Sequence, residues 1–83
     1  MIEIQEGKRF TWLVTGGAGF LGCHVCNFLV KKNQRVISYD IDQIPENEKP
    51  DGLVEITADI RNNDELKKII KGVDYVVHCA GEL

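Results

Sequence analysis

The stretch Thr15-Gly16-Gly17-Ala18-Gly19-Phe20-Leu21-Gly22 decides the fold of this chain, because it places four of the eight glycines between two apolar segments. Residues 10–14 before it are apolar and β-prone, and residues 20–30 after it are apolar with helical spacing. A strand, a glycine turn and a helix in this order direct free backbone N–H groups and the positive end of the helix dipole at one place. Glycine permits the tight turn and leaves room for a pyrophosphate group. The stretch therefore predicts an anion site at the start of a helix.

Composition and charge narrow the class of protein. The chain has 83 residues, of which 43% are hydrophobic and 28% are charged, as expected for one small globular domain. The net charge of −3 provides no basic surface for nucleic acid, and no apolar run approaches the roughly 20 residues of a membrane span. The acidic segment 1–6 does not resemble a signal peptide. We therefore expect a cytoplasmic protein that binds neither nucleic acid nor membranes.

The three cysteines, Cys23, Cys26 and Cys79, give an odd count, which favours free thiols over a disulfide framework. Cys23 and Cys26 form a Cys-x-x-Cys pair, but the pair lies just inside the predicted helix rather than at its very start, where the dipole would lower the thiol pKa. A zinc site would need further ligands, for which His24 and His78 are the other near candidates. We predict packing cysteines and no metal site. We expect His24 to be a helix-surface or packing residue rather than a catalyst, and His78 to be a hydrogen-bonded core residue.

Hydrophobic periodicity predicts that strands and helices alternate. Strands are expected at residues 10–15, 35–40, 53–57 and 75–79, with a helix at about 20–32 and a loop at 41–52. A second helix is expected to begin after Asn62, because Glu65 follows it at capping-box spacing, and to stop at Gly72.

The first helix has an apolar stripe and an expected end. Leu21, Val25 and Leu29 recur every four residues, with Gly22 and Cys26 beside them, and this stripe should lie on the sheet. Asn33 is expected to end the helix in a left-handed conformation.

This order of elements implies an α/β fold of the Rossmann type, a parallel sheet with right-handed crossovers. The first helix leads to the second and third strands on one side of the first strand, and the second helix returns the chain to the other side. The expected strand order is therefore 3-2-1-4, with helices on both faces. The glycine turn and Ala80-Gly81 then meet at the switch point between the first and fourth strands, where ligands of such sheets bind.

Two acidic residues close neighbouring strands of this predicted sheet. Asp40 follows Gly22 by 18 residues, at the position from which a carboxylate binds the ribose hydroxyls of an adenosine. A carboxylate there repels a 2′-phosphate, so Asp40 favours NAD over NADP. Asp59 closes the third strand, where its carboxylate can accept a hydrogen bond from the adenine amino group; the alternative is a polar loop residue or a charge at the entry to the second helix.

The sequence resembles the short-chain dehydrogenase/reductase superfamily, and within it the extended, epimerase/dehydratase-like branch. The matching segments occur in the family's order across residues 15–81: Thr15 to Gly22, Tyr39-Asp40, Ala58-Asp59-Ile60-Arg61 and Val76-Val77-His78-Cys79-Ala80-Gly81. The resemblance implies an NAD-binding protein in which the pyrophosphate, the adenosine ribose, the adenine and the middle of the cofactor are each contacted. It implies that Gly16, Gly19 and Gly22, with Phe20 and Leu21, lie at the pyrophosphate and that Asp40 binds the adenosine ribose. It implies that Asp59 and Ile60 lie around the adenine. Beside the middle of the cofactor it implies Cys79, Ala80 and Gly81.

The chain departs from the family in one respect. Family members use a tyrosine with a lysine four residues later, but here Gln43 and Cys79 follow Tyr39 and Tyr75 at that spacing, so no catalytic residue is predicted. We therefore expect residues 1–83 to be the N-terminal part of a larger enzyme, without its catalytic and substrate-binding parts. The fourth strand is an apolar edge that a missing C-terminal part or another subunit should cover.

Three functions are consistent with the sequence. The first is a nucleotide-sugar epimerase/dehydratase or related oxidoreductase, the second a 3β-hydroxysteroid dehydrogenase-like enzyme, and the third a non-catalytic dinucleotide-binding module. A structural fragment that binds nothing is the remaining alternative.

Overall fold

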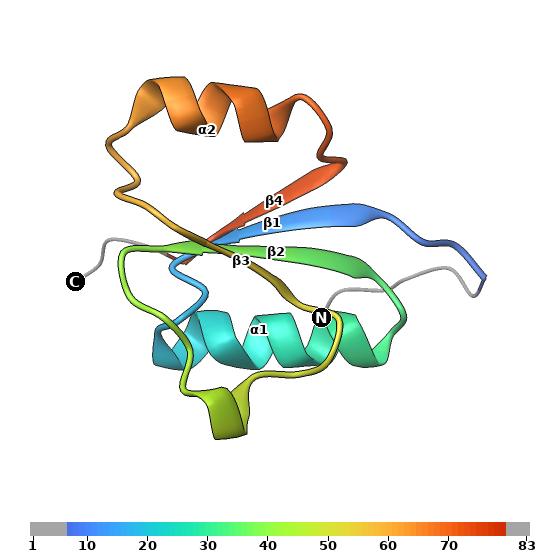
Figure 1. Ribbon diagram of the computed structural model, residues 1–83. Coiled ribbons are helices and arrows are strands. Elements are labelled where there is room, and N and C mark those ends of the chain that lie inside the picture. Colours follow the sequence, from blue (N-terminus) through green and yellow to red (C-terminus); the bar gives the residue numbers. More distant parts are fainter. Residues whose placement is uncertain (1–6, 80–83) are drawn as a thin grey trace.

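The computed structural model describes residues 7–79 and shows a four-stranded parallel sheet between two α-helices (Figure 1). Along the chain the elements are β1 (Thr11–Thr15), α1 (Phe20–Lys31), β2 (Arg35–Asp40), the 3₁₀ helix η1 (Glu46–Glu48), β3 (Val54–Thr57), α2 (Asn63–Ile70) and β4 (Tyr75–His78). The strand order is β3-β2-β1-β4, and every neighbouring pair is parallel. The predicted Rossmann-type topology is confirmed.

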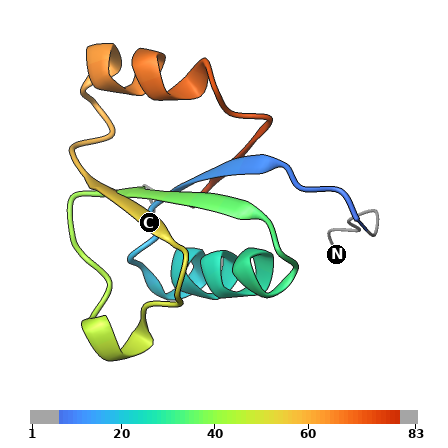
Figure 2. The same ribbon diagram turned by 45° about the vertical axis from the view of Figure 1, so that its right-hand side comes forward.

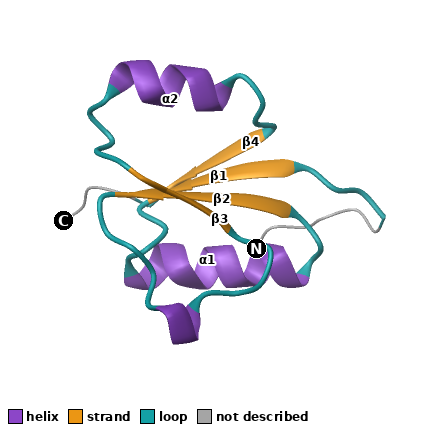
Figure 3. Ribbon diagram, in the orientation of Figure 1, coloured by secondary structure: helices purple, strands orange, loops and turns teal. Residues whose placement is uncertain are grey.

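The two α-helices lie on opposite faces of the sheet, as Figures 2 and 3 show. α1 carries the chain from β1 to β2, and α2 carries it from β3 back across the sheet to β4. This reversal places the carboxyl ends of β1 and β4 side by side, where Thr15 and His78 are in register. The described residues therefore form the switch point at which ligands of open α/β sheets bind.

The main hydrophobic core lies between the sheet and α1. Trp12 and Val14 of β1 and Val36 of β2 pack there against Cys26 and Leu29 of α1. This face accounts for Trp12 and Val14 within the apolar run 10–14, and the intervening Leu13 is buried on the other face of the sheet.

The predicted sheet-facing stripe of α1 is wrong at Leu21, which is 62% exposed. The helix instead buries Gly22, Cys26 and Leu29. A side chain on Gly22 would overlap the backbone of Gly16, so the missing side chain lets the helix approach the turn closely. Because of this close approach, the helix face with Gly22, Cys26 and Leu29 points toward the sheet, and Leu21 is left exposed to solvent.

The opposite face of the sheet is less well covered. Leu13 and Tyr39 are buried on it, but Val54 and Val76 remain 54% and 51% exposed. α2 contributes no fully buried residue, and its Ile70 is 44% exposed. Much of this apolar face is therefore open within residues 7–79.

The helix ends lie where the sequence signals predict them. Asn33 is left-handed, with φ of 61°, and Asn62 Oδ1 accepts the N–H of Glu65 at 3.2 Å as the cap of α2. Gly72 directly follows Lys71, the C-cap of α2, although its backbone is not left-handed. The segment predicted as a loop also contains η1, which begins after Pro45.

Gln34, between α1 and β2, joins residues 8–12 to the end of α1 through its buried amide. Its Oε1 accepts the backbone N–H of Phe10 at 2.9 Å and the indole N–H of Trp12 at 3.0 Å. Its Nε2 donates to the carbonyls of Lys8 at 2.7 Å and Lys32 at 3.0 Å. All four hydrogen-bonding positions of the amide are therefore used.

Gln34→Ala should lower the free energy of unfolding by about 2–4 kcal/mol, because it leaves several of these partially or fully buried groups without a partner. Denaturant titration measures this loss. Gln43→Ala is the matched control, since Gln43 is exposed, and it should change stability by less than about 0.5 kcal/mol. Equal denaturation midpoints for the two variants would contradict the structural role of the Gln34 hydrogen bonds.

Candidate cofactor site

The turn between β1 and α1 is fixed by its own glycines. Gly16 has a left-handed backbone, with φ of 73°, and its N–H donates to the carbonyl of Tyr39 at 2.8 Å. A side chain on Gly17 would overlap that of Ser38 on β2. Gly16, Gly17 and Gly22 are therefore required to build the turn and to pack it against β2 and α1.

Gly19 has a different environment. Its backbone is extended, with φ of −77° and ψ of 172°, and a Cβ atom there would meet only the Gly16 carbonyl, at 3.4 Å. Gly19 is the N-cap of α1 and supplies no side-chain cap. The first N–H groups of the helix, starting at Phe20 and Leu21, have no intrahelical acceptor. The turn therefore presents open space and uncapped N–H groups, which is the arrangement that binds anions.

Asp40 links this turn to the end of β2. Its Oδ2 accepts the N–H of Ala18 at 3.0 Å, and its Oδ1 accepts the N–H of Asp42 at 2.9 Å. An ionised carboxylate has about four acceptor positions, so about two remain for a ligand. Asp40 can therefore hold the turn and bind hydroxyl groups at the same time.

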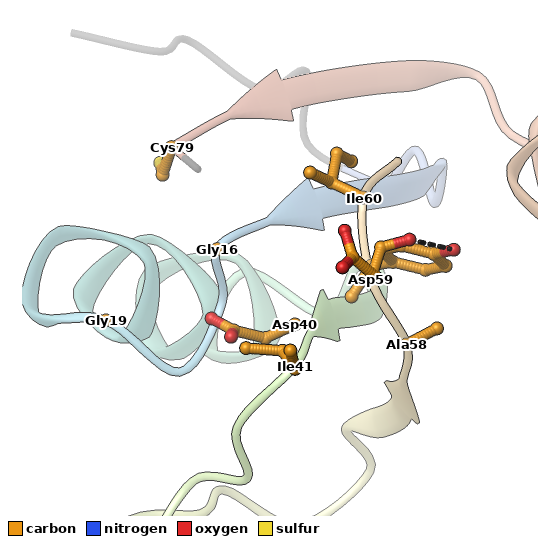
Figure 4. Close-up of a pocket in the computed structure, with 9 residues that line it drawn as sticks. Gly16, Gly19, Asp40, Ile41, Ala58, Asp59, Ile60 and Cys79 are labelled. Carbon is orange, nitrogen blue, oxygen red and sulfur yellow. Dashed lines mark hydrogen bonds between the residues drawn. The ribbon is translucent and has the colours of Figure 1, made fainter. Parts of the chain in front are cut away.

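A cavity of about 330 Å³ opens beside Asp40 at the carboxyl end of the sheet (Figure 4). This volume lies near the lower end of the roughly 300–1,000 Å³ typical of ligand pockets. Six of its lining residues belong to the predicted site: Gly16, Gly19, Asp40, Asp59, Ile60 and Cys79. The cavity therefore unites the glycine turn with the ends of β2, β3 and β4.

Five residues of the predicted site do not line this cavity in the described structure. Phe20 and Leu21 lie at the start of α1 with 86% and 62% of their residue surface exposed, and Gly22 packs beneath the turn. Ala80 and Gly81 lie outside the described residues.

The loop after β3 brings Asp59 to the cavity together with a cation. The Arg61 guanidinium lies side-on to the Asp59 carboxylate, with Nη2 2.6 Å from Oδ2 and Nε 3.0 Å from Oδ1. The backbone N–H of Arg61 also donates to Oδ1, at 2.9 Å. These contacts hold the pKa of Asp59 down to about 2, so the carboxylate is ionised at neutral pH.

Three further residues line the cavity that the sequence prediction did not include: Tyr39, Ile41 and Ala58. Each is the direct neighbour of a predicted acidic residue at a strand end. Their positions could have been proposed from that adjacency, because a cavity at a strand end also contacts the neighbouring positions.

Neither tyrosine is placed as an acid/base group in the described structure. Tyr39 is buried, with 1% of its surface exposed, and Tyr75 begins β4 at the end of the sheet away from the cavity. His78 is exposed rather than in the core, which corrects its prediction, because β4 is an edge strand among residues 7–79. Its ring Nδ1 lies 2.6 Å from Thr15 Oγ1, so the predicted hydrogen bonding is present.

Cys26 is fully buried in the core between α1 and the sheet, and burial raises the pKa of its thiol to about 12, with the neighbouring Cys23 and Cys79 adding to the increase. Within residues 7–79 no group of three potential ligands is arranged to hold a metal ion. In the same range, no helix has the length and apolar character needed to cross a bilayer.

Cys26 should resist alkylation at pH 8 in the native chain, because both burial and the lack of thiolate slow the reaction. Mass spectrometry after iodoacetamide treatment would measure labelling at each cysteine. The partly buried Cys23 provides an internal comparison, and labelling of Cys26 should become rapid in denaturant. Equally rapid labelling of native Cys26 would contradict the described packing.

Comparison with known families agrees with this arrangement. Residues 12–83 match the model of the NAD dependent epimerase/dehydratase family. The chain belongs to this family.

Individual relatives match the chain over nearly all of its length. Sterol-4-alpha-carboxylate 3-dehydrogenase, decarboxylating, of Mus musculus is 35% identical over 78 residues, which are 94% of this chain and 20% of that protein. UDP-glucose 4-epimerase of Thermotoga maritima, solved with UDP-glucose, has a TM-score of 0.75 and 28% identity over 87% of this chain and 24% of its own. A short-chain dehydrogenase of Leptospira borgpetersenii with bound NAD⁺ has a TM-score of 0.77 and 30% identity over 99% of this chain and 36% of its own.

The chain spans about a fifth of the length of the curated relatives it matches, 19% and 20% for two of them. The similarity therefore concerns the part of these family members that contains the glycine turn and the four strands.

Proposed function

We propose that this chain binds NAD, with the adenosine in the cavity and the pyrophosphate on the open side of the glycine turn. The observation that carries the proposal is the uncapped start of α1 at Gly19 beside the Asp40 carboxylate at the end of β2. The N–H groups suit the phosphates, and the free acceptor positions of Asp40 suit the ribose hydroxyls. Family membership and the NAD⁺-bound Leptospira neighbour support the choice of cofactor.

The proposed contacts follow the dinucleotide from one end toward its middle. Asp59 and Ile60 bind the adenine, and Asp40 binds its ribose and disfavours the 2′-phosphate of NADP. Gly16 and Gly19 leave space for the pyrophosphate, while Phe20, Leu21 and Gly22 supply N–H groups. Cys79, Ala80 and Gly81 would lie beside the middle of the cofactor.

We propose that the whole protein is an extended short-chain dehydrogenase/reductase, of which these residues form the N-terminal part of the Rossmann domain. Bound NAD would supply the hydride acceptor for a substrate carbon that bears a hydroxyl group. This chain would hold and orient the cofactor, and a Tyr-x-x-x-Lys pair elsewhere in the protein would perform proton transfer. The exposed Tyr75 and Val76 on β4 suggest that further chain or another subunit covers this edge.

A nucleotide sugar is the proposed substrate, supported by the likeness to the Thermotoga UDP-glucose 4-epimerase. A sterol is the alternative, supported by the 35% identity to the murine sterol-4-alpha-carboxylate 3-dehydrogenase. Assays of the whole protein with UDP-glucose and with a 3β-hydroxysterol would distinguish the two.

A non-catalytic binding module is the third candidate, and a stop codon directly after Leu83 in the coding sequence would favour it. The three free thiols favour the cytoplasm as the proposed compartment.

Calorimetry with fragments of the cofactor tests the binding proposal. NAD and ADP-ribose should both bind, because both carry the adenosine and the pyrophosphate, whereas nicotinamide mononucleotide should bind much more weakly. Circular dichroism would establish that the chain is folded. A folded chain that binds neither NAD nor ADP-ribose at millimolar concentration would refute the proposed function.

A further inference from the structure

Tyr39 contacts the loop that follows β3 and lines the cavity, although it makes none of the proposed contacts with NAD. Its ring is buried at the end of β2, and its hydroxyl donates to the backbone carbonyl of Asp59 at 3.3 Å, the bond shown dashed in Figure 4. The bond joins β2 to the loop that carries both Asp59 and Ile60. Tyr39 lines the same cavity as these two residues.

The loop has few other attachments to the sheet at this point. The N–H of Ala58 donates to the Asp40 carbonyl at 2.9 Å, which fixes the loop where it leaves β3. The Asp59 carbonyl also accepts the N–H of Asn62 at 2.9 Å, a contact made within the loop itself. β2 therefore holds the loop at two points, through the Asp40 carbonyl at Ala58 and through the Tyr39 hydroxyl, which bonds to Asp59 itself.

The Asp59 side chain is oriented by a separate contact. Its carboxylate accepts three donors from Arg61. The backbone N–H donates to Oδ1, Nη2 donates to Oδ2, and Nε–H is shared between Oδ1 at 3.0 Å and Oδ2 at 3.1 Å. About one of its four acceptor positions remains free. One free acceptor matches a single N–H, such as that of an exocyclic amino group on a purine.

The Tyr39 hydroxyl remains a donor over the physiological pH range. Burial raises the pKa of Tyr39, and the negative charges of Glu65 and Asp59 raise it further. The hydrogen bond to the Asp59 carbonyl therefore does not depend on pH near neutrality.

We propose that Tyr39 is a positioning residue for base recognition, which holds the Asp59 backbone so that the free carboxylate acceptor faces the 6-amino group of adenine. The inference rests on the proposed binding of NAD. It adds a determinant of base specificity at a residue that does not itself bond the base. A 6-oxopurine presents an acceptor where adenine presents a donor, so the Asp59 carboxylate repels it.

Tyr39→Phe tests the proposal, because it keeps the buried ring and removes only the hydroxyl. Calorimetry would measure the affinities of NAD and of nicotinamide hypoxanthine dinucleotide for the wild-type and variant proteins. Loss of one neutral hydrogen bond should weaken NAD about 2- to 10-fold and the hypoxanthine analogue less, so the preference for adenine should fall. A merely structural role would weaken both ligands equally.

Tyr75→Phe is the matched control, since Tyr75 is the other tyrosine of the chain and lies on β4 away from the cavity. It should leave the preference for adenine unchanged, and thermal melts would show that both variants are folded. An unchanged preference in folded Tyr39→Phe, with NAD still bound by the wild type, would overturn this inference alone. A wild-type protein that binds neither dinucleotide would overturn the proposed function, and this inference with it.

Discussion

Gly19→Val should abolish NAD binding while the chain remains folded. The backbone of Gly19 is extended, a conformation that valine adopts readily, and a Cβ atom there would have only the Gly16 carbonyl nearby, at 3.4 Å. The added methyl groups would occupy the open side of the turn, where we place the pyrophosphate. Hydrogen bonds to a charged group contribute about 1.5–3 kcal/mol each, so losing two of them should weaken NAD roughly a hundredfold or more. Calorimetry with NAD measures this change.

Two other glycines provide controls for this result. Gly22→Val should unfold the chain, because its side chain would overlap the backbone of Gly16 and Gly17. Gly72→Val should affect neither folding nor binding, because a Cβ atom at Gly72 has no neighbour within 4 Å. NAD affinity that survives in folded Gly19→Val would show that the phosphates lie elsewhere.

The contrast among these glycines explains how much of the site the sequence could predict. Spacing in the glycine stretch predicts a strand, a turn and a helix, and these are present. Spacing does not reveal which glycine is required for close packing of the turn and which leaves space for a ligand, because that depends on neighbours distant in sequence. Ser38 on β2 determines the need for Gly17, and close packing of α1 determines the need for Gly22.

The topology could be predicted almost completely, since alternation of strands and helices with right-handed crossovers leaves few arrangements. The orientation of α1 could not, because Leu21 and Gly22 both fit an apolar stripe. Only the contact of Gly22 with the turn decides between them.

The hydrogen bonds of buried polar side chains also could not be predicted from the sequence. Gln34 follows a helix and resembles an ordinary surface residue, but its amide bonds to four groups contributed by two separate segments of the chain. Tyr39 resembles a strand residue, and its partner is a backbone carbonyl 20 positions away. Such contacts depend on tertiary structure, which no local pattern of residues encodes.

Asp40→Ala should weaken NAD roughly a hundredfold or more and NADP considerably less. The carboxylate has acceptor positions free for the ribose hydroxyls, and losing two charge-assisted hydrogen bonds should cost about 3 kcal/mol or more. For NADP the same change removes a repulsive charge near the 2′-phosphate. It also frees the N–H of Ala18, which in the wild type donates to Asp40 Oδ2 at 3.0 Å. The ratio of the two affinities, measured by calorimetry, is therefore more informative than either affinity alone.

The ratio also separates cofactor recognition from the structural contact between Asp40 and the turn. Loss of the Ala18 contact alone would loosen the turn and weaken both cofactors by a similar factor. Asp42 is an exposed aspartate two residues after Asp40. Asp42→Ala therefore removes one negative charge near the turn without removing Asp40, so it controls for the general electrostatic effect and should leave the ratio of the two affinities unchanged. An unchanged ratio in Asp40→Ala would limit Asp40 to holding the turn, and selection between NAD and NADP would then have to come from other residues.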